Sequence, residues 1–266
     1  MKKYVSILAV TVLLAGCDWN VLQGKNGNST SNGEQPASQA DQSSGQKPSD
    51  PDLTLEAAHF NEIVEVKGKK EIANPDNMLV LVNKIYGLPG DYEPEDLVRP
   101  KVAFAFGDQD IEKSYLRKEA ANALEQMFQA AAKDGIQLYA SSGYRSYGRQ
   151  QALFENEIVQ AGEEKASEVV AIPGNSEHQT GLAMDITSES VQFALSEEFG
   201  DMEEGQWLKN NAHLYGFILR YPKGKENITG FSYEPWHFRY VGKKASEVIF
   251  KHNWTLEEYF DHVSKM

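Results

Sequence analysis

The sequence predicts an α+β fold in which helices pack around a small, mainly antiparallel sheet. One stretch, from Ser114 to Lys133, carries apolar residues at steps of three and four, which is typical of an amphipathic helix. Two shorter stretches, Leu182 to Ile186 and Trp236 to Tyr240, alternate as strands with one buried face do. Helical and strand-like segments follow one another in no regular order, and no internal repeat is visible. This irregular order favours α+β.

Length and composition limit the possibilities further. A chain of 266 residues is long enough for one large domain or two small ones, and 41% hydrophobic residues suffice for a proper core. The single cysteine excludes an internal disulfide. A net charge of −13 argues against binding to a phosphate backbone, so we expect no nucleic-acid partner.

The N-terminus has the pattern of a targeting segment. Two lysines precede an apolar run from Val5 to Leu14, which is too short to span a bilayer comfortably. The run ends in Leu14-Ala15-Gly16-Cys17, the pattern of a bacterial lipobox. We therefore predict that residues 1–16 are a signal peptide and that Cys17 carries the lipid anchor. The alternative is a plain secretory signal with a chance cysteine.

Residues 17–52 are predicted to be a disordered tether behind the lipidated cysteine. They are rich in Ser, Gly, Gln, Asn, Asp and Pro, and such a composition buries too little apolar surface to order the chain. A flexible coil of about 35 residues spans roughly 30 Å. The tether either holds the folded domain, residues 53–266, away from the membrane or is a spacer without a geometric requirement.

The folded part is predicted to begin with short strands at Ile63 to Val66 and Met78 to Val82. The helix from Ser114 to Lys133 has Ser114 as its cap, and Ser146 caps a second helix that starts at Tyr147. The remaining predicted elements are strands at Ile136–Ala140 and Phe217–Tyr221, a partly helical acidic stretch at Glu163–Val170, a largely helical region at Ser196–Gly216, and C-terminal helices near Lys243–His252 and Leu256–Val263.

The stretch from Ser176 to Ile186 has the features of a metal site. In the predicted strand, Leu182, Met184 and Ile186 share one face, and Asp185 lies on the other beside the small Ala183. A carboxylate with open space next to it is well placed to bind a metal ion. His178 precedes it across a glycine turn.

The second half of this site appears in the stretch from Tyr233 to Tyr240. His237 and Arg239 face away from Trp236, Phe238 and Tyr240 on the predicted strand. His178, Asp185 and His237 as ligands, with Glu234 as a nearby general base, match a catalytic zinc site that leaves one position open for water. Pro235 interrupts the strand, so Glu234 and His237 can both face the ion.

Arg145 lies just before the helix that Ser146 caps. The guanidinium and the helix N-terminus both contribute positive potential there, which suits a substrate carboxylate. The alternative for Arg145 is an internal ion pair. Ser176 is a candidate hydrogen-bond donor to the substrate, or simply a loop cap.

These residues carry a family resemblance. The chain resembles the VanY-type D-alanyl-D-alanine carboxypeptidases, and in particular their LdcB-like lipoprotein branch, over roughly Asn77 to the C-terminus. The motifs are Ser141-Ser142-Gly143-Tyr144-Arg145-Ser146, the stretch from Pro173 to Gly181 with Asp185, and Glu234-Pro235-Trp236-His237. The resemblance implies the fold shared with Hedgehog signalling domains. It also implies that Arg145 and Gln150 contact the substrate, although solvent exposure is the alternative for Gln150.

The resemblance and the residues together predict a zinc carboxypeptidase that removes the C-terminal D-alanine from peptidoglycan stem peptides. LdcB-like members cut tetrapeptides (L,D activity), and VanY-type members cut D-Ala-D-Ala in pentapeptides (D,D activity). The lipobox, the tether and the Ser-Glu-His-Gln-Thr-Gly motif favour L,D activity. We expect a monomer, anchored by lipid outside the cytoplasm and facing the wall. The alternatives are a non-catalytic wall-binding module and a structural lipoprotein spacer.

Overall fold

The computed structural model of the protein describes residues 51–266. The predicted signal peptide, the lipidated Cys17 and nearly all of the predicted tether lie outside these described residues. Within the described residues, no helix is both long and apolar enough to cross a membrane.

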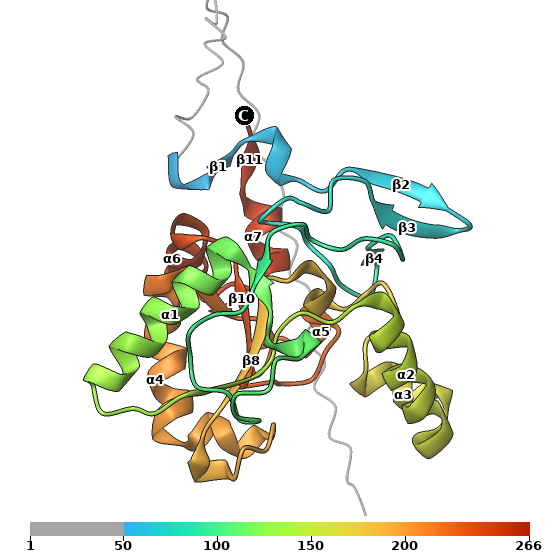
Figure 1. Ribbon diagram of the computed structural model, residues 1–266. Coiled ribbons are helices and arrows are strands. Elements are labelled where there is room, and N and C mark those ends of the chain that lie inside the picture. The colour runs from blue at the N-terminus through green and yellow to red at the C-terminus, as the bar shows by residue number, and fades with distance from the viewer. Residues whose placement is uncertain (1–50) are drawn as a thin grey trace, which may run out of the picture. The chain divides into compact units, whose positions relative to one another are not determined.

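A four-stranded sheet lies at the centre of the fold (Figure 1). Its strands run in the order β7 (Tyr139–Ser142), β8 (Ala183–Thr187), β10 (His237–Tyr240) and β9 (Phe217–Leu219), and every neighbouring pair is antiparallel. Three smaller sheets surround it: β2 (Ile63–Val66), β3 (Lys69–Ile72) and β4 (Tyr86–Gly87); β5 (Leu97–Val98) and β6 (Leu116–Arg117); β1 (Thr54–Leu55) and β11 (Ser264–Lys265). The predicted α+β class is confirmed.

The helices form two groups, one to the left and one to the right of the central strands in the view of Figure 1. One group contains α1 (Lys118–Lys133), α4 (Glu203–Asn211) and α6 (Lys243–His252). The other contains α2 (Tyr147–Ala161) and α3 (Glu163–Val169). The short helices α5 (Glu226–Thr229) and α7 (Leu256–His262) and the one-turn 3-10 helices complete the fold, and the 3-10 helix η4 (Glu177–Thr180) matters most for the site.

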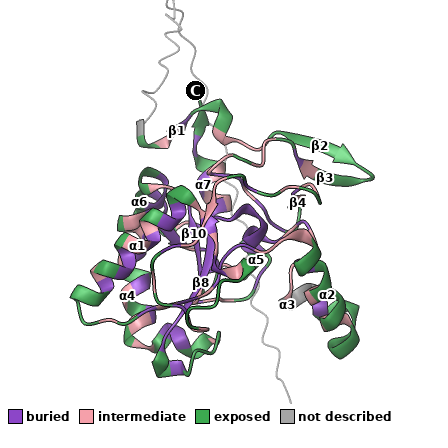
Figure 2. Ribbon diagram, viewed as in Figure 1, coloured by how far each residue is buried: buried purple, intermediate pink, exposed green. Residues whose placement is uncertain are grey.

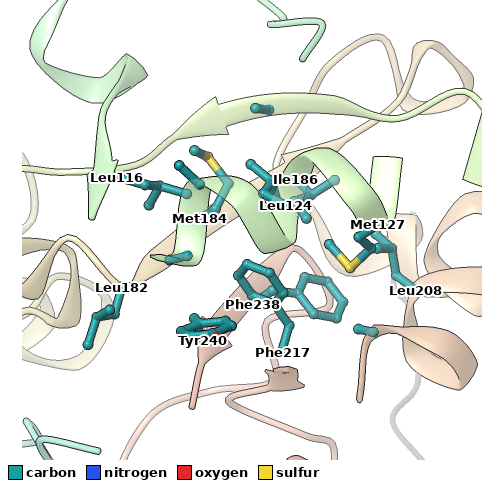
Figure 3. Close-up of a cluster of buried hydrophobic side chains, with 14 of the residues drawn as sticks. Leu116, Leu124, Met127, Leu182, Met184, Ile186, Leu208, Phe217, Phe238 and Tyr240 are labelled. Carbon is teal, nitrogen blue, oxygen red and sulfur yellow. The ribbon is translucent and has the colours of Figure 1, made fainter. Parts of the chain in front are cut away.

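The main hydrophobic core lies between α1 and one face of the sheet (Figure 3). Leu124 and Met127 of α1 are fully buried against Met184 and Ile186 of β8 and Phe238 of β10. The alternation predicted for β8 and β10 is therefore confirmed, because their apolar residues face this core.

The opposite face of the sheet is also covered, so β8 and β10 are buried throughout (Figure 2). Part of the cover is a second apolar cluster in which Ile218 of β9 packs with residues of α6 and α7. The polar residues of β8 and β10 also lie on this face. A sheet buried on both faces gives its polar side chains fixed surroundings.

The helix predicted from Ser114 begins four residues later, at Lys118. Ser114 does not cap it; its hydroxyl donates to the carbonyl of Ile111, and Leu116 and Arg117 pair with β5 instead. The second helix begins as predicted, because the Ser146 hydroxyl accepts a hydrogen bond from the backbone N–H of Arg149. Strands β7 and β9 are displaced or shortened by two or three residues relative to the predicted ranges.

The strand predicted at Met78 to Val82 is absent from the described structure, although Leu79, Val80 and Val82 are buried as predicted. Side chains from distant segments, and not a neighbouring strand, form hydrogen bonds with the backbone of this segment. The Arg239 guanidinium donates to the carbonyl of Val80 at 2.8 Å. Apolar sequence indicated burial here, but not the kind of hydrogen-bond partner.

Candidate metal centre and active site

The pairing of β8 with β10 brings two of the predicted ligands together. The antiparallel register sets His237 directly opposite Asp185, and Phe238 opposite Met184 on the core face. The Nδ1 atom of His237 lies 3.0 Å from Oδ1 of Asp185. Asp185 also pairs with Ser142 of β7, next to a bulge in that strand.

The third predicted ligand, His178, comes from η4, immediately before β8. Gly181 ends η4 in the left-handed conformation (φ +64°), which glycine adopts without steric cost and which turns the chain into the strand. The Nδ1 atom of His178 lies 2.8 Å from the carbonyl oxygen of Gly143, so Nδ1 carries the proton and donates it. The other ring nitrogen, Nε2, lies 3.4 Å from Oδ2 of Asp185.

His178, Asp185 and His237 therefore form one buried cluster. Each offers a ligand atom, and these atoms all lie within 4.8 Å of one another. The two imidazole rings meet edge to face, with centroids 4.9 Å apart. Two nitrogens and one carboxylate oxygen fit zinc, and three protein ligands leave a position open for water or substrate.

The electrostatics of the cluster also fit a cation. Burial by itself opposes the charge of Asp185, but His178 and His237 outweigh it and hold its pKa well below the usual range. Burial likewise opposes a charge on His237, yet hydrogen bonds to Asp185 and Glu177 raise its pKa to about 9. The surroundings of Asp185 and His237 therefore stabilise positive charge between them, whereas burial lowers the pKa of His178 and favours its neutral, ligand form.

Glu234 lies beside the cluster, in the turn before β10. Its Oε2 atom is 3.9 Å from Nδ1 of His237. Burial raises the pKa of the Glu234 carboxyl to about 7. A carboxyl group that exchanges its proton near neutral pH has the property required of a general acid–base residue.

Arg145 is half-buried and has no carboxylate within ion-pairing distance among residues 51–266, so the predicted alternative of an internal ion pair is wrong for this structure. Its guanidinium donates to Oε1 of Gln150 at 2.9 Å and to the Ser142 hydroxyl at 3.2 Å. Burial lowers the pKa of Arg145, and the more distant carboxylate of Asp185 offsets this effect only in part. This cation would be stabilised by an anionic ligand.

Gln150 and Ser176 differ in their access to the site. Gln150 is buried, and the amide nitrogen of its side chain donates to the carbonyl of Ala171 at 2.6 Å. It thus holds Arg145, and its direct contact with substrate stays a prediction. The Ser176 side chain makes no hydrogen bond that caps η4, and it lines the cleft described next.

A cleft of about 330 Å³ opens onto the cluster. Residues of α2 line part of the cleft, and Trp236 and Leu195 also border it. Trp236 both borders the cleft and packs against the main core, whereas Tyr144 is not among the lining side chains. The polar residues that line the cleft are Arg145, Asn156, Glu157, Ser176, Glu177, His178, Asp185, Tyr221, Glu234 and His237.

One group at the site was not predicted from the sequence. Glu177 has no exposed side-chain surface and approaches His237, with Oε2 3.4 Å from Nε2. Its other oxygen accepts hydrogen bonds from Arg220 at 2.7 Å and from Arg239 at 2.9 Å. The only signal in the sequence was the place of Arg239 on the same strand face as His237.

Comparison with known proteins identifies relatives of this chain. The family model described as VanY, D-alanyl-D-alanine carboxypeptidase, matches residues 113–243. The putative carboxypeptidase YodJ of Bacillus subtilis (strain 168) is 58% identical over 215 residues, covering 81% of this chain and 78% of the relative.

Two solved structures show the same fold. One, described as the LdcB LD-carboxypeptidase, is 58% identical with a TM-score of 0.78, over 80% of this chain and 100% of that one. The other, described as the vancomycin resistance D,D-pentapeptidase VanY in complex with Zn(II), is 33% identical with a TM-score of 0.56, over 69% and 98%.

The cluster predicts a testable dependence of metal content on Asp185. The purified protein should hold close to one zinc ion per chain, measured by plasma mass spectrometry after dialysis. Asp185→Asn should lower that content severalfold, because an amide supplies neither the charge nor the basicity of the carboxylate. Asp201→Asn, at an exposed position, is the control. Equal zinc contents in the two variants would exclude Asp185 as a ligand.

Proposed function

The chain belongs to the VanY family of D-alanyl-D-alanine carboxypeptidases, and on this basis we propose that it is a zinc-dependent carboxypeptidase acting on peptidoglycan stem peptides. It removes their C-terminal D-alanine. The observation that carries this proposal is a single cleft that contains the His178–Asp185–His237 cluster, the half-buried Glu234 and an arginine without an anionic partner. A non-catalytic wall-binding module needs neither the base nor a complete ligand set.

The proposed chemistry divides between the ion and the side chains. Zinc bound to these side chains supplies a water of lowered pKa and polarises the scissile carbonyl. Glu234 accepts the proton of the attacking water and then returns it to the amino group of the departing D-alanine. Its pKa of about 7 suits both transfers.

Arg145 makes the enzyme an exopeptidase in this proposal. Its guanidinium binds the terminal carboxylate of the substrate, and Gln150 and Ser142 hold it in place through the two hydrogen bonds described above. The substrate amide next to that carboxylate then lies near the metal cluster, because Arg145, His178 and Glu234 line the same cleft. Ser176 is a further donor to the substrate.

We favour L,D activity, which converts a tetrapeptide to a tripeptide. The LdcB LD-carboxypeptidase structure is 58% identical to this chain, whereas the D,D-pentapeptidase VanY structure is 33% identical. The D,D alternative remains a distinct outcome of the test below.

The first experiment offers tetrapeptide and pentapeptide muropeptides separately to the purified protein, with and without a chelator. Mass spectrometry should show loss of D-alanine from the tetrapeptide, abolished by the chelator. Glu234→Gln should retain zinc but lose at least about 100-fold in turnover, since only the base is removed. Trimming of the pentapeptide alone would establish D,D activity. If neither peptide were cleaved in a chelator-sensitive way, the wall-binding module would be favoured.

The cleft contains a further feature that suits L,D activity. Gln150, Leu153 and Glu157 lie at three- and four-residue steps along α2 and so share one helix face. Glu157 lies two turns, about 10 Å, beyond the Gln150 that holds Arg145. Its half-buried carboxylate lines the cleft and has no cationic partner in the described part of the chain. In a tetrapeptide, the residue before the scissile bond is a diamino acid, whose free amino group would complement this carboxylate.

We expect Glu157→Gln to weaken the preference for that amino group. The wild-type protein should cleave a tetrapeptide with lysine at the third position roughly fivefold better, in kcat/KM, than one with the uncharged norleucine. The variant should cleave both about equally. Glu155→Gln, which removes the same charge from an exposed position of α2, should keep the preference. An unchanged ratio in Glu157→Gln would reject this role but leave L,D activity standing.

The proposal extends to location, because peptidoglycan lies outside the cytoplasm. We propose that the protein acts there as a monomer attached to the membrane through acyl chains on Cys17. The full sequence has a net charge of −13, and a negative protein is not attracted to anionic lipid. Attachment would therefore depend on the acyl chains. Intact-mass measurement of detergent-extracted protein should give a chain that begins at an acylated Cys17. An unacylated chain in the soluble fraction would reject the anchor.

A further inference from the structure

The carboxylate of Glu177 divides its two oxygens between different partners. Oε1 accepts hydrogen bonds from Nε of Arg220 at 2.7 Å and from Nη1 of Arg239 at 2.9 Å. Oε2 faces Nε2 of His237 at 3.4 Å. All four side chains are almost completely buried, with exposures of 0% for Glu177 and both arginines and 4% for His237. Water therefore cannot readily replace any of these contacts.

The two nitrogens of His237 consequently have different tasks. Nδ1 faces Oδ1 of Asp185, a partner in the proposed zinc cluster, and Nε2 faces Glu177. A metal-binding imidazole is neutral and keeps one proton, on the nitrogen that does not bind the ion. A carboxylate next to Nε2 accepts that proton in a hydrogen bond and keeps it there. The lone pair of Nδ1 then points to the metal.

We propose that Glu177 is a positioning residue, which fixes the tautomer and orientation of His237 for metal binding. This inference rests on the proposed zinc site. His178 is held in the opposite way, since its Nδ1 donates to the backbone carbonyl of Gly143 and its Nε2 faces Asp185. One ligand is thus oriented by a neighbouring main-chain carbonyl and the other by an ionised side chain.

The surroundings of Glu177 prevent it from turning away. The Arg220 guanidinium is held from its other side by both oxygens of Glu257, at 2.8 and 2.6 Å. The Arg239 guanidinium also donates to the carbonyls of Tyr240 and Val80. With both arginines fixed, Oε1 remains occupied and Oε2 remains directed at His237.

The competing explanation is that Glu177 only neutralises two buried arginines. Glu257 provides a matched control, because it neutralises Arg220 without touching His237. Glu177→Gln changes the contact with His237 in a defined way. The glutamine oxygen must face the arginines, so its NH2 group would face Nε2 of His237, where it cannot accept a proton.

The test measures zinc affinity by competition with a chromogenic chelator for the wild-type protein, Glu177→Gln and Glu257→Gln. Both variants should lose thermal stability, because each removes a buried or half-buried anion from an arginine. Only Glu177→Gln should raise the zinc dissociation constant, by about 10- to 100-fold, whereas Glu257→Gln should change it less than about threefold. Equal effects of the two variants, or none, would overturn the proposal.

A second measurement uses the wild-type protein alone, so it tests the role of Glu177 even if Glu177→Gln fails to fold. Long-range ¹⁵N–¹H NMR of the zinc-loaded wild-type protein should show the His237 proton on Nε2 and the His178 proton on Nδ1. A His237 proton on Nδ1 would reject the role of Glu177. Failure of the wild-type protein to bind zinc would instead reject the proposed metal site, and the inference with it.

Discussion

The geometry of the site depends on the register between β8 and β10. In that register Met184 and Phe238 meet on the core face, and Asp185 and His237 meet on the other. A slip of one residue would turn Asp185 and His237 toward α1 and expose the apolar residues to the polar face. The apolar packing that fixes the register therefore also fixes the separation of two proposed metal ligands. The fold and the site share one constraint.

The polar face of the sheet requires a different kind of stabilisation. Burying Glu177, Arg220 and Arg239 removes three charges from water, which is costly unless each charge is paired and hydrogen-bonded. Here the arginines are satisfied by Glu257 of α7, by the carbonyl of Val80 and by Glu177 itself. The segment before the catalytic motifs and the helix after them thus contribute to the same charge network. Residues before and after the proposed ligands therefore hold the buried charges next to His237 in place.

Sequence alone revealed those parts of the site that follow from local pattern. Alternation assigned the faces of β8 and β10, and Ser146 marked the start of α2. Predictions from the sequence were wrong where contacts with residues far away in the chain determine the structure. The segment Met78–Val82 looked like a strand, but side chains satisfy its backbone, and Ser114 looked like a helix cap, but the chain there pairs as β6. The approach of Glu177 to His237 could not be predicted from local pattern, because 60 residues of sequence separate them.

The proposed preference for a chain end follows from the state of Arg145. Its guanidinium is half-buried and hydrogen-bonded only to uncharged groups, so the folded protein holds a cation that lacks full compensation. A terminal carboxylate supplies the missing charge, whereas the interior of a peptide supplies only a neutral carbonyl. A desolvated charged group in a binding site strongly disfavours ligands that leave its charge unpaired. This loss of binding free energy is larger than the gain that a ligand obtains from a good fit of shape alone. Selectivity for chain ends would thus arise from the cost of leaving Arg145 unpaired.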